Sequence, residues 1–196
     1  MSLSKYIPSF LKTNKIYFNL IKNRYYKRLS HTKDVAPEYR DVFNALVKDG
    51  VVIIPNFISN DIIDSILSET KDPLSAVMSN EYDKTKHHYF PNYGTYQVLE
   101  CDKISPSSKI FFDNNLINEL ACSYVSKDVN SFQKMIELRP DPGKESVSDI
   151  FHFDDWRHRY KAFLYLTDVS NENAPFVYLK GSHAPHKWRE KKEYEY

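Results

Sequence analysis

The segment from Phe151 to His183 constrains the fold of this chain most, because short apolar runs alternate there with turn residues. Residues 161–169 (KAFLYLTDV) predict a strand. Residues 171–183 predict a polar turn, a second short strand and a glycine turn that carries His183. The 15% aromatic content of the chain also suits a β-rich core. We therefore predict strands and turns, not helices, for this part of the chain.

His152 and Asp154 stand just ahead of that segment, separated by one residue. In an extended backbone, residues i and i+2 point to the same face, so the imidazole and the carboxylate can converge on one metal ion. They would supply two of the three ligands of the facial triad that holds non-haem Fe(II). The structural alternative is a strand-end histidine that is hydrogen-bonded to solvent or to a neighbouring carboxylate.

The run from 151 to 183 resembles the phytanoyl-CoA dioxygenase family of Fe(II)/2-oxoglutarate oxygenases. In that family the His-x-Asp pair is followed by a strand ending in Leu-Thr-Asp-Val, an Asn-Gly-Pro-like turn and Gly-Ser-His, and residues 166–169, 171–175 and 181–183 match this order. Ala174 stands where the family usually has glycine. Residues 49–57 and the Ser59-capped helix after them are similar to the family's entry strand and helix, so the resemblance covers about residues 37–183.

The resemblance implies an α+β fold with N-terminal helices and a double-stranded β-helix, or jelly roll, as its core. In these oxygenases a second metal histidine, and an arginine that pairs with the far carboxylate of 2-oxoglutarate, lie beyond the Gly-Ser-His turn. Residues 187–196 (KWREKKEYEY) contain no histidine and predict no barrel strand. We therefore expect a jelly roll that is incomplete at its C-terminal end.

A third metal ligand would then have to come from elsewhere in the chain. His183 or His186 could reach the metal if their turn folds back, although His183 could equally bond local backbone. His158 lies in a charged loop and is expected to be solvated. Of His87 and His88, at most one could face the metal, because adjacent residues of a strand point in opposite directions.

The cosubstrate needs a cation for its far carboxylate, and charge-assisted pairing favours Arg or Lys. Lys161 opens the strand after the His-x-Asp pair, a position resembling that from which JmjC-type oxygenases supply a lysine. We predict that Lys161 binds 2-oxoglutarate; the alternative is an ordinary edge lysine that faces solvent. Arg139 is a further candidate cation.

Charge divides the 196-residue chain into a basic arm, 1–33, and a domain, 34–196. Eight of the 27 Lys and Arg residues lie in the arm, and none of the 26 Asp and Glu residues does. The arm could pack on the domain as an amphipathic helix, lie on an anionic membrane surface or act as a transit peptide. It holds no run of 18 apolar residues that would span a bilayer, and we expect no nucleic-acid partner because no recognised module is present.

Elements in the rest of the chain are predicted from apolar spacing and turn residues. The predicted helices are 5–29, 37–48, 60–69 with Ser59 as its cap, and 114–126. The further predicted strands are 51–55 and 95–99. The strand 95–99 lies within a stretch, 71–108, that is otherwise predicted to be irregular.

The function that best fits these features is an Fe(II)/2-oxoglutarate-dependent hydroxylase, or a truncated relative of one, acting on a small molecule. Fe(II) and 2-oxoglutarate are the implied cofactors. The alternatives are an inactive binding or structural module that retains the front half of the fold, and a cupin-like metal enzyme that does not use 2-oxoglutarate. The two cysteines, Cys101 and Cys122, belong to no metal motif, so we expect a reduced, cytoplasmic setting, with membrane association through the arm left open.

Overall fold

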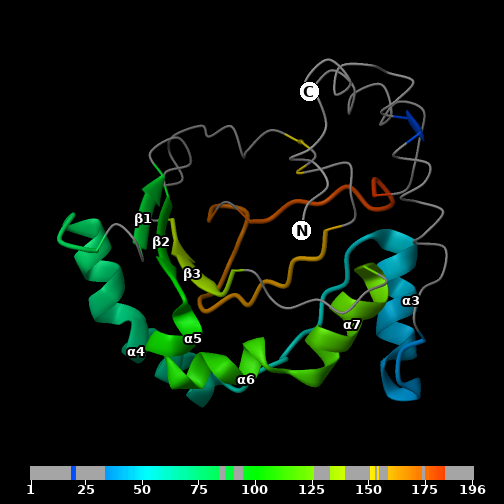
Figure 1. The fold of residues 1–196 in the computed structure, drawn as a ribbon, viewed down its shortest axis with the longest axis horizontal. Helices are drawn as coiled ribbons and strands as arrows, with labels where there is room; N and C mark the ends of the chain where they lie inside the picture. The colour runs from blue at the N-terminus through cyan, green and yellow to red at the C-terminus, as the bar shows by residue number, and fades with distance from the viewer. Residues whose placement is uncertain are drawn as a thin grey trace.

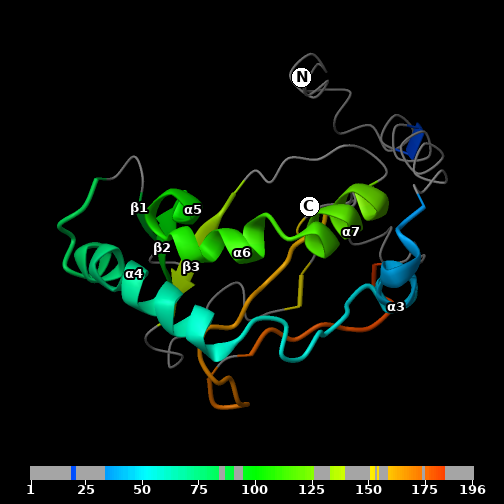
Figure 2. The same ribbon diagram turned by 90° about the horizontal axis from the view of Figure 1, so that it is seen from below.

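The computed structural model describes residues 34–83, 87–90, 95–125, 133–139, 159–173 and 175–183, with the short pieces 19–20, 151–152 and 154; at 87–90 it describes the backbone alone. The helices follow one another along one side of the molecule, from α4 beside the sheet to α3 at the opposite end (Figure 1). The segments 159–173 and 175–183 run between these ends. The view from below shows the same order of helices (Figure 2).

The sheet contains three antiparallel strands in the order β1-β2-β3. They are β1 (His87–Phe90), β2 (Thr95–Leu99) and β3 (Met135–Leu138). Gln97 is paired with His88 on one side and with Glu137 on the other, and the Gln97 side chain donates a hydrogen bond of 2.6 Å to the Glu137 carboxylate. This cross-strand bond fixes the register on the exposed face of β2 and β3.

Helix α4 (Asn60–Met78) covers the other face of the sheet and builds the first core. Its buried residues recur at helical spacing, so they form one stripe along the helix. The core they enter contains Ile66, Val77, Val98, Cys101 and Ile136. Thr70 lies in the same stripe. Its buried hydroxyl is satisfied, because Oγ1 donates a hydrogen bond of 2.7 Å to the Ile66 carbonyl.

A second, smaller core lies where α3 (Arg40–Asp49) meets α7 (Asn115–Val125). Its buried members are Val35, Phe43 and Leu120, and Tyr160 packs against them from the later part of the chain. A short 3-10 helix, η2 (Pro37–Tyr39), leads into α3. The chain just before it is fixed by a hydrogen bond from the Ala36 N–H to the Glu119 carboxylate on α7.

Three short helices connect β2 to α7: α5 (Cys101–Ile104), η3 (Pro106–Ser108) and α6 (Lys109–Phe112). The Lys134 ammonium, next to β3, ties them to the sheet. It pairs with Asp102 at 3.2 Å and with Asp113 at 3.1 Å, and it lies 5.7 Å from the centre of the Phe112 ring.

The predicted helices at 37–48 and 114–126 are confirmed as η2 with α3 and as α7, and the strand at 95–99 is confirmed as β2. The helix predicted at 60–69 begins at Asn60 as expected but continues through Pro73 to Met78. It continues because its apolar stripe extends along the sheet as far as Val77, and this burial outweighs the missing N–H of the proline. The prediction that 71–108 is largely irregular was therefore wrong. The helix predicted at 5–29 falls outside the described residues, apart from Asn19 and Leu20.

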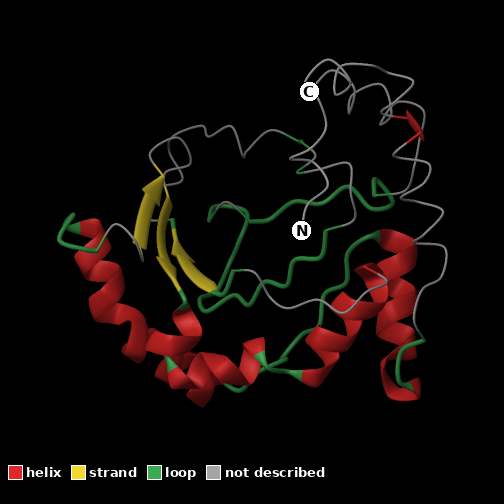
Figure 3. Cartoon of the chain, in the orientation of Figure 1, coloured by secondary structure: helices red, strands yellow, loops and turns green. Residues whose placement is uncertain are grey.

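Three predicted strands, which are 51–55, 161–169 and the short strand within 171–183, are not strands among the residues that the structure describes (Figure 3). In the second segment the side chains still alternate, since Leu164 and Leu166 pack on the first core while Phe163 and Tyr165 are more than half exposed. The side chains of this segment therefore alternate as they do in a strand. A strand also needs a neighbour to exchange backbone hydrogen bonds, and the sheet that the described residues form does not extend to this segment.

The α+β class is confirmed by these helices and this sheet. A jelly roll consists of two facing sheets. The part of the chain that the structure describes contains one sheet of three strands, so the second sheet is not seen there.

Candidate metal centre around His152 and Asp154

The structure brings the side chains of His152 and Asp154 together. The imidazole Nε2 lies 3.5 Å from the carboxylate Oδ1, and both side chains are partly exposed, at 45% and 37%. Convergence of this kind is what the spacing of two residues allows on an extended backbone. A solvent-borne ion could therefore reach both donor atoms.

The separation fits joint binding of one divalent cation. Two ligands at right angles on a metal, each bonded at about 2.1 Å, lie about 3 Å apart. A shift of about half an ångström would bring Nε2 and Oδ1 to that spacing, so the pair fits two neighbouring coordination positions. Across the ranges that the structure describes, no group of three or more His, Cys, Asp or Glu side chains gathers around an ion-sized site.

Lys161 contributes a third side chain to this centre. Its ammonium Nζ lies 2.5 Å from Oδ2 of Asp154, the oxygen that His152 does not face. Burial alone would raise the pKa of the Asp154 carboxyl. The hydrogen bond and charge of Lys161, with smaller contributions from His152 and Arg159, more than offset this and hold the pKa below its ordinary value. Asp154 is therefore ionised at neutral pH, as a metal ligand must be.

Arg159, whose charge helps to lower the pKa of Asp154, was not identified from the sequence as part of this centre. Its position five residues after Asp154 was the available signal, but loop conformation decides whether such a residue turns back. The other candidate cation, Arg139, follows β3 and donates through Nε to the Glu137 carboxylate at 3.0 Å. The role of Lys161 toward 2-oxoglutarate stays a prediction.

His183 lies instead at the end of α3. Its Nε2 is 2.9 Å from the backbone carbonyl of Val47. A carbonyl oxygen can only accept, so Nε2 must carry the hydrogen and cannot at the same time offer a lone pair to a metal. The expectation of a bond to local backbone was partly right, because the partner is backbone, but it lies 136 residues away along the chain.

Two further contacts hold the Gly-Ser-His turn on α3. The N–H of Gly181 donates to the Asp49 carbonyl at 2.7 Å, and the Lys180 ammonium pairs with the Asp49 carboxylate at 3.4 Å. The sequence signal that could have indicated this contact is Gly50, which ends α3 in the left-handed region with φ 76°. His158 and His186 fall outside the described residues. His87 and His88 occupy adjacent positions of β1, opposite Val98 and Gln97.

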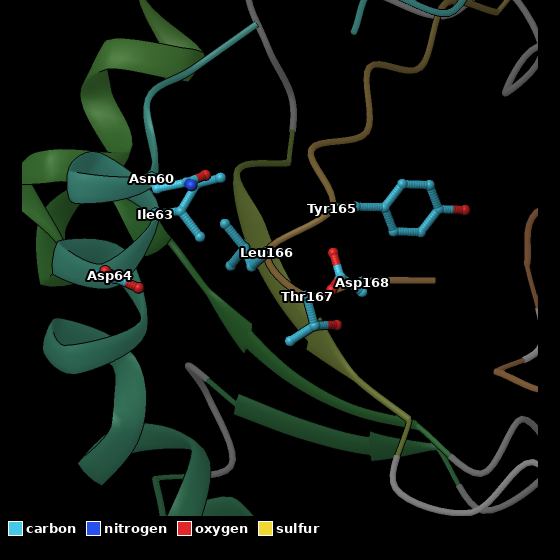
Figure 4. Close-up of a pocket in the computed structure, with 7 residues that line it drawn as sticks. All are labelled: Asn60, Ile63, Asp64, Tyr165, Leu166, Thr167 and Asp168. Carbon is cyan, nitrogen blue, oxygen red and sulfur yellow. The ribbon is translucent and has the colours of Figure 1, made fainter. Parts of the chain in front are cut away.

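A separate cavity of about 280 Å³ lies where the first turn of α4 faces residues 165–168. Figure 4 shows Leu166 directed toward Ile63 of α4, while the ring of Tyr165 points away from that helix. The polar part of the lining comes from Asn60, Asp64, Thr167 and Asp168. The lining includes neither His152 nor Asp154, so the cavity and the candidate metal centre share no residue.

Comparison with known protein families agrees with the order of these motifs. The family model for phytanoyl-CoA dioxygenase (PhyH) matches residues 46–196, which is more than half of the chain. The chain therefore belongs to the phytanoyl-CoA dioxygenase family. This places it, at the coarser level, in the Fe(II)/2-oxoglutarate-dependent oxygenase superfamily of dioxygenase-type oxidoreductases, whose fold is cupin-like and whose members generally depend on Fe(II) and 2-oxoglutarate.

Neither the search of curated proteins nor the search of solved structures returned a match. Of the helices that the structure describes, none has both the length and the apolar character needed to cross a bilayer.

Proposed function

We propose that this protein is an Fe(II)/2-oxoglutarate-dependent hydroxylase of a small molecule, with His152 and Asp154 as two of its metal ligands. The observation that carries the proposal is the 3.5 Å approach of Nε2 and Oδ1 in a chain whose family generally uses this chemistry. The jelly-roll core belongs to the same proposal, and its support is family membership.

Iron bound with 2-oxoglutarate and oxygen would supply an oxidant strong enough to hydroxylate a C–H bond. The protein's own residues would bind and orient. His152 would present the lone pair of Nε2, and Asp154 would offer an ionised oxygen at neutral pH because its pKa is lowered. Lys161 is our candidate for the far carboxylate of 2-oxoglutarate. An ammonium has three donors, so one bond to Asp154 does not exhaust it.

Succinate release in the presence of iron and 2-oxoglutarate tests this function without knowledge of the substrate. We expect the wild-type chain to release succinate only when iron is added. His152→Ala and Asp154→Asn should each reduce the rate more than about tenfold, since losing a direct ligand should cost at least as much as losing a group that orients one.

His183→Ala is the matched control, because it removes a histidine whose Nε2 is engaged by Val47. It should leave the rate within about twofold. Loss of activity in this variant, with its fold intact, would assign His183 to the metal instead.

The alternative is an inactive binding module. It is favoured by the lack of a third described donor near His152 and Asp154. Iron that binds to the wild-type chain without any succinate being released would support this alternative and contradict the hydroxylase.

For the arm, 1–33, we propose binding to an anionic membrane surface by a protein that is otherwise cytoplasmic. The support is the concentration of basic residues in the arm. Co-sedimentation with phosphatidylserine vesicles should be lost in high salt, and lost when the chain starts at Asp34.

A further inference from the structure

The two oxygens of Asp154 have different partners. Oδ1 lies 3.5 Å from Nε2 of His152, while Oδ2 lies 2.5 Å from Nζ of Lys161. The carboxylate is thus held by one oxygen and presents the other toward the imidazole. Nothing in the spacing of His152 and Asp154 requires this division of the two oxygens.

A bond between an ammonium and a carboxylate at such a distance is charge-assisted, and it is short for its class. Carboxylates that bind metals are often fixed by a partner on their other oxygen, which sets the orientation of the donor. Lys161 lies seven residues beyond Asp154 in the chain, and its ammonium is within hydrogen-bonding distance of Oδ2. Its side chain is half exposed, at 50%.

We propose that Lys161 is a positioning residue that makes Asp154 a one-oxygen ligand. By occupying Oδ2, the lysine leaves Oδ1 as the oxygen offered to a divalent cation together with His152. The inference rests on the proposed metal site. It does not depend on whether 2-oxoglutarate is the cosubstrate.

Metal affinity alone does not test this role. Removing the lysine would relax the carboxylate and weaken binding, but it would also remove a positive charge that repels the cation and so strengthen binding. The coordination mode is the decisive measurement. A carboxylate that binds through one oxygen has a wider separation between its asymmetric and symmetric infrared stretches than one that binds through both.

The experiment uses the full chain with Co(II), which is stable in air. Calorimetry first shows whether Co(II) binds, and infrared difference spectra of the wild type against Asp154→Asn then identify the bands of Asp154. We expect a wide separation in the wild type, a narrower one in Lys161→Met, and the wide separation again in Lys161→Arg. Lys103→Met is the matched control, because it breaks an ion pair of 2.6 Å with Glu100 on the solvent-exposed side of α5. Its spectrum should equal that of the wild type.

The same bands in Lys161→Met and in the wild type would overturn the positioning role, as would a narrow separation in the wild type. If Co(II) does not bind to the wild type, the proposed metal site fails, and the role of Lys161 fails with it. Circular dichroism of each variant confirms folding, and Lys161→Ala replaces the Met variant if that variant does not fold.

Discussion

Gly50 decides whether two segments far apart in the sequence can meet. It ends α3 with φ 76°. A Cβ at this position would overlap the His183 ring at Nδ1 and would approach the Tyr178 hydroxyl to 2.5 Å. Glycine is therefore required here for two reasons: the backbone conformation and the space that the turn at 181–183 occupies. At the residue scale, this contact anchors the end of the described chain.

A non-glycine residue in the left-handed region costs about 1–3 kcal/mol. We expect Gly50→Ala to lower the free energy of unfolding by more than this cost alone, because the side chains of His183 and Tyr178 must also move. Gly181→Ala is the matched control: it has the same φ of 76°, but nothing lies within 4 Å of the position that its new methyl group would take. Urea denaturation of both variants measures the difference. Equal losses would show that His183 and Tyr178 do not press on Gly50.

At the scale of elements, the N-termini of α4 and α7 differ in a way that their sequences do not reveal. Ser59 precedes α4 as predicted, but its side chain makes no capping bond, and its carbonyl accepts the first helical bonds from Ile62 and Ile63. Asn114 precedes α7, and its Oδ1 accepts from the N–H groups of Leu116 at 3.0 Å and Ile117 at 3.4 Å. The second helix therefore has a side-chain cap and the first does not.

Replacing each residue with alanine tests this difference. We expect Asn114→Ala to lower the free energy of unfolding by about 1 kcal/mol, the usual cost of a lost N-cap. Ser59→Ala should change it by less than about 0.5 kcal/mol, as at an ordinary surface position. Thermal denaturation of the two variants under the same conditions is the measurement. A larger loss for Ser59→Ala would mean that its hydroxyl caps α4 in solution.

On the scale of the whole molecule, Glu69 joins the helix that covers the sheet to the short helices that lead away from it. Its carboxylate accepts from the Ser105 hydroxyl at 2.5 Å, and from the hydroxyl and the N–H of Ser107 at 2.8 Å and 3.1 Å. The bond from the Ser105 hydroxyl is the largest cause of a lowered pKa of Glu69, followed by that from the Ser107 hydroxyl, while desolvation acts in the opposite direction. The packing of α4 against η3 is thus linked to the charge of one carboxylate.

Stability should depend on pH through this group. A pKa that is lower in the folded than in the unfolded state adds stability above the ordinary value of 4.5, and that stability is lost as the pH falls through the lowered pKa. We expect Glu69→Gln to have a lower melting temperature than the wild type at pH 7, with the gap closing toward pH 3. Glu38→Gln, which changes an exposed carboxylate on η2, is the control. A gap that is the same at both pH values would contradict the role of the Glu69 charge.

Local patterns in the sequence determined much of this protein. Apolar spacing and turn residues were enough to predict α3, α7 and β2, because these features act between near neighbours. The motif order from His152 to His183 was enough to indicate the family, which the match to residues 46–196 confirms. The strand predicted at 161–169 did not form, although side chains 163–166 alternate between the core and the surface.

Tertiary structure alone decided the rest. Whether residues 161–169 become a strand depends on a neighbouring strand, and the continuation of α4 through Pro73 depends on the sheet beneath it. The partner of His183 lies on a helix 136 residues earlier in the chain. The contact of Lys161 with Oδ2 of Asp154 is likewise decided by tertiary structure. Each is a contact between groups that the chain brings together only by folding, so local sequence does not determine it.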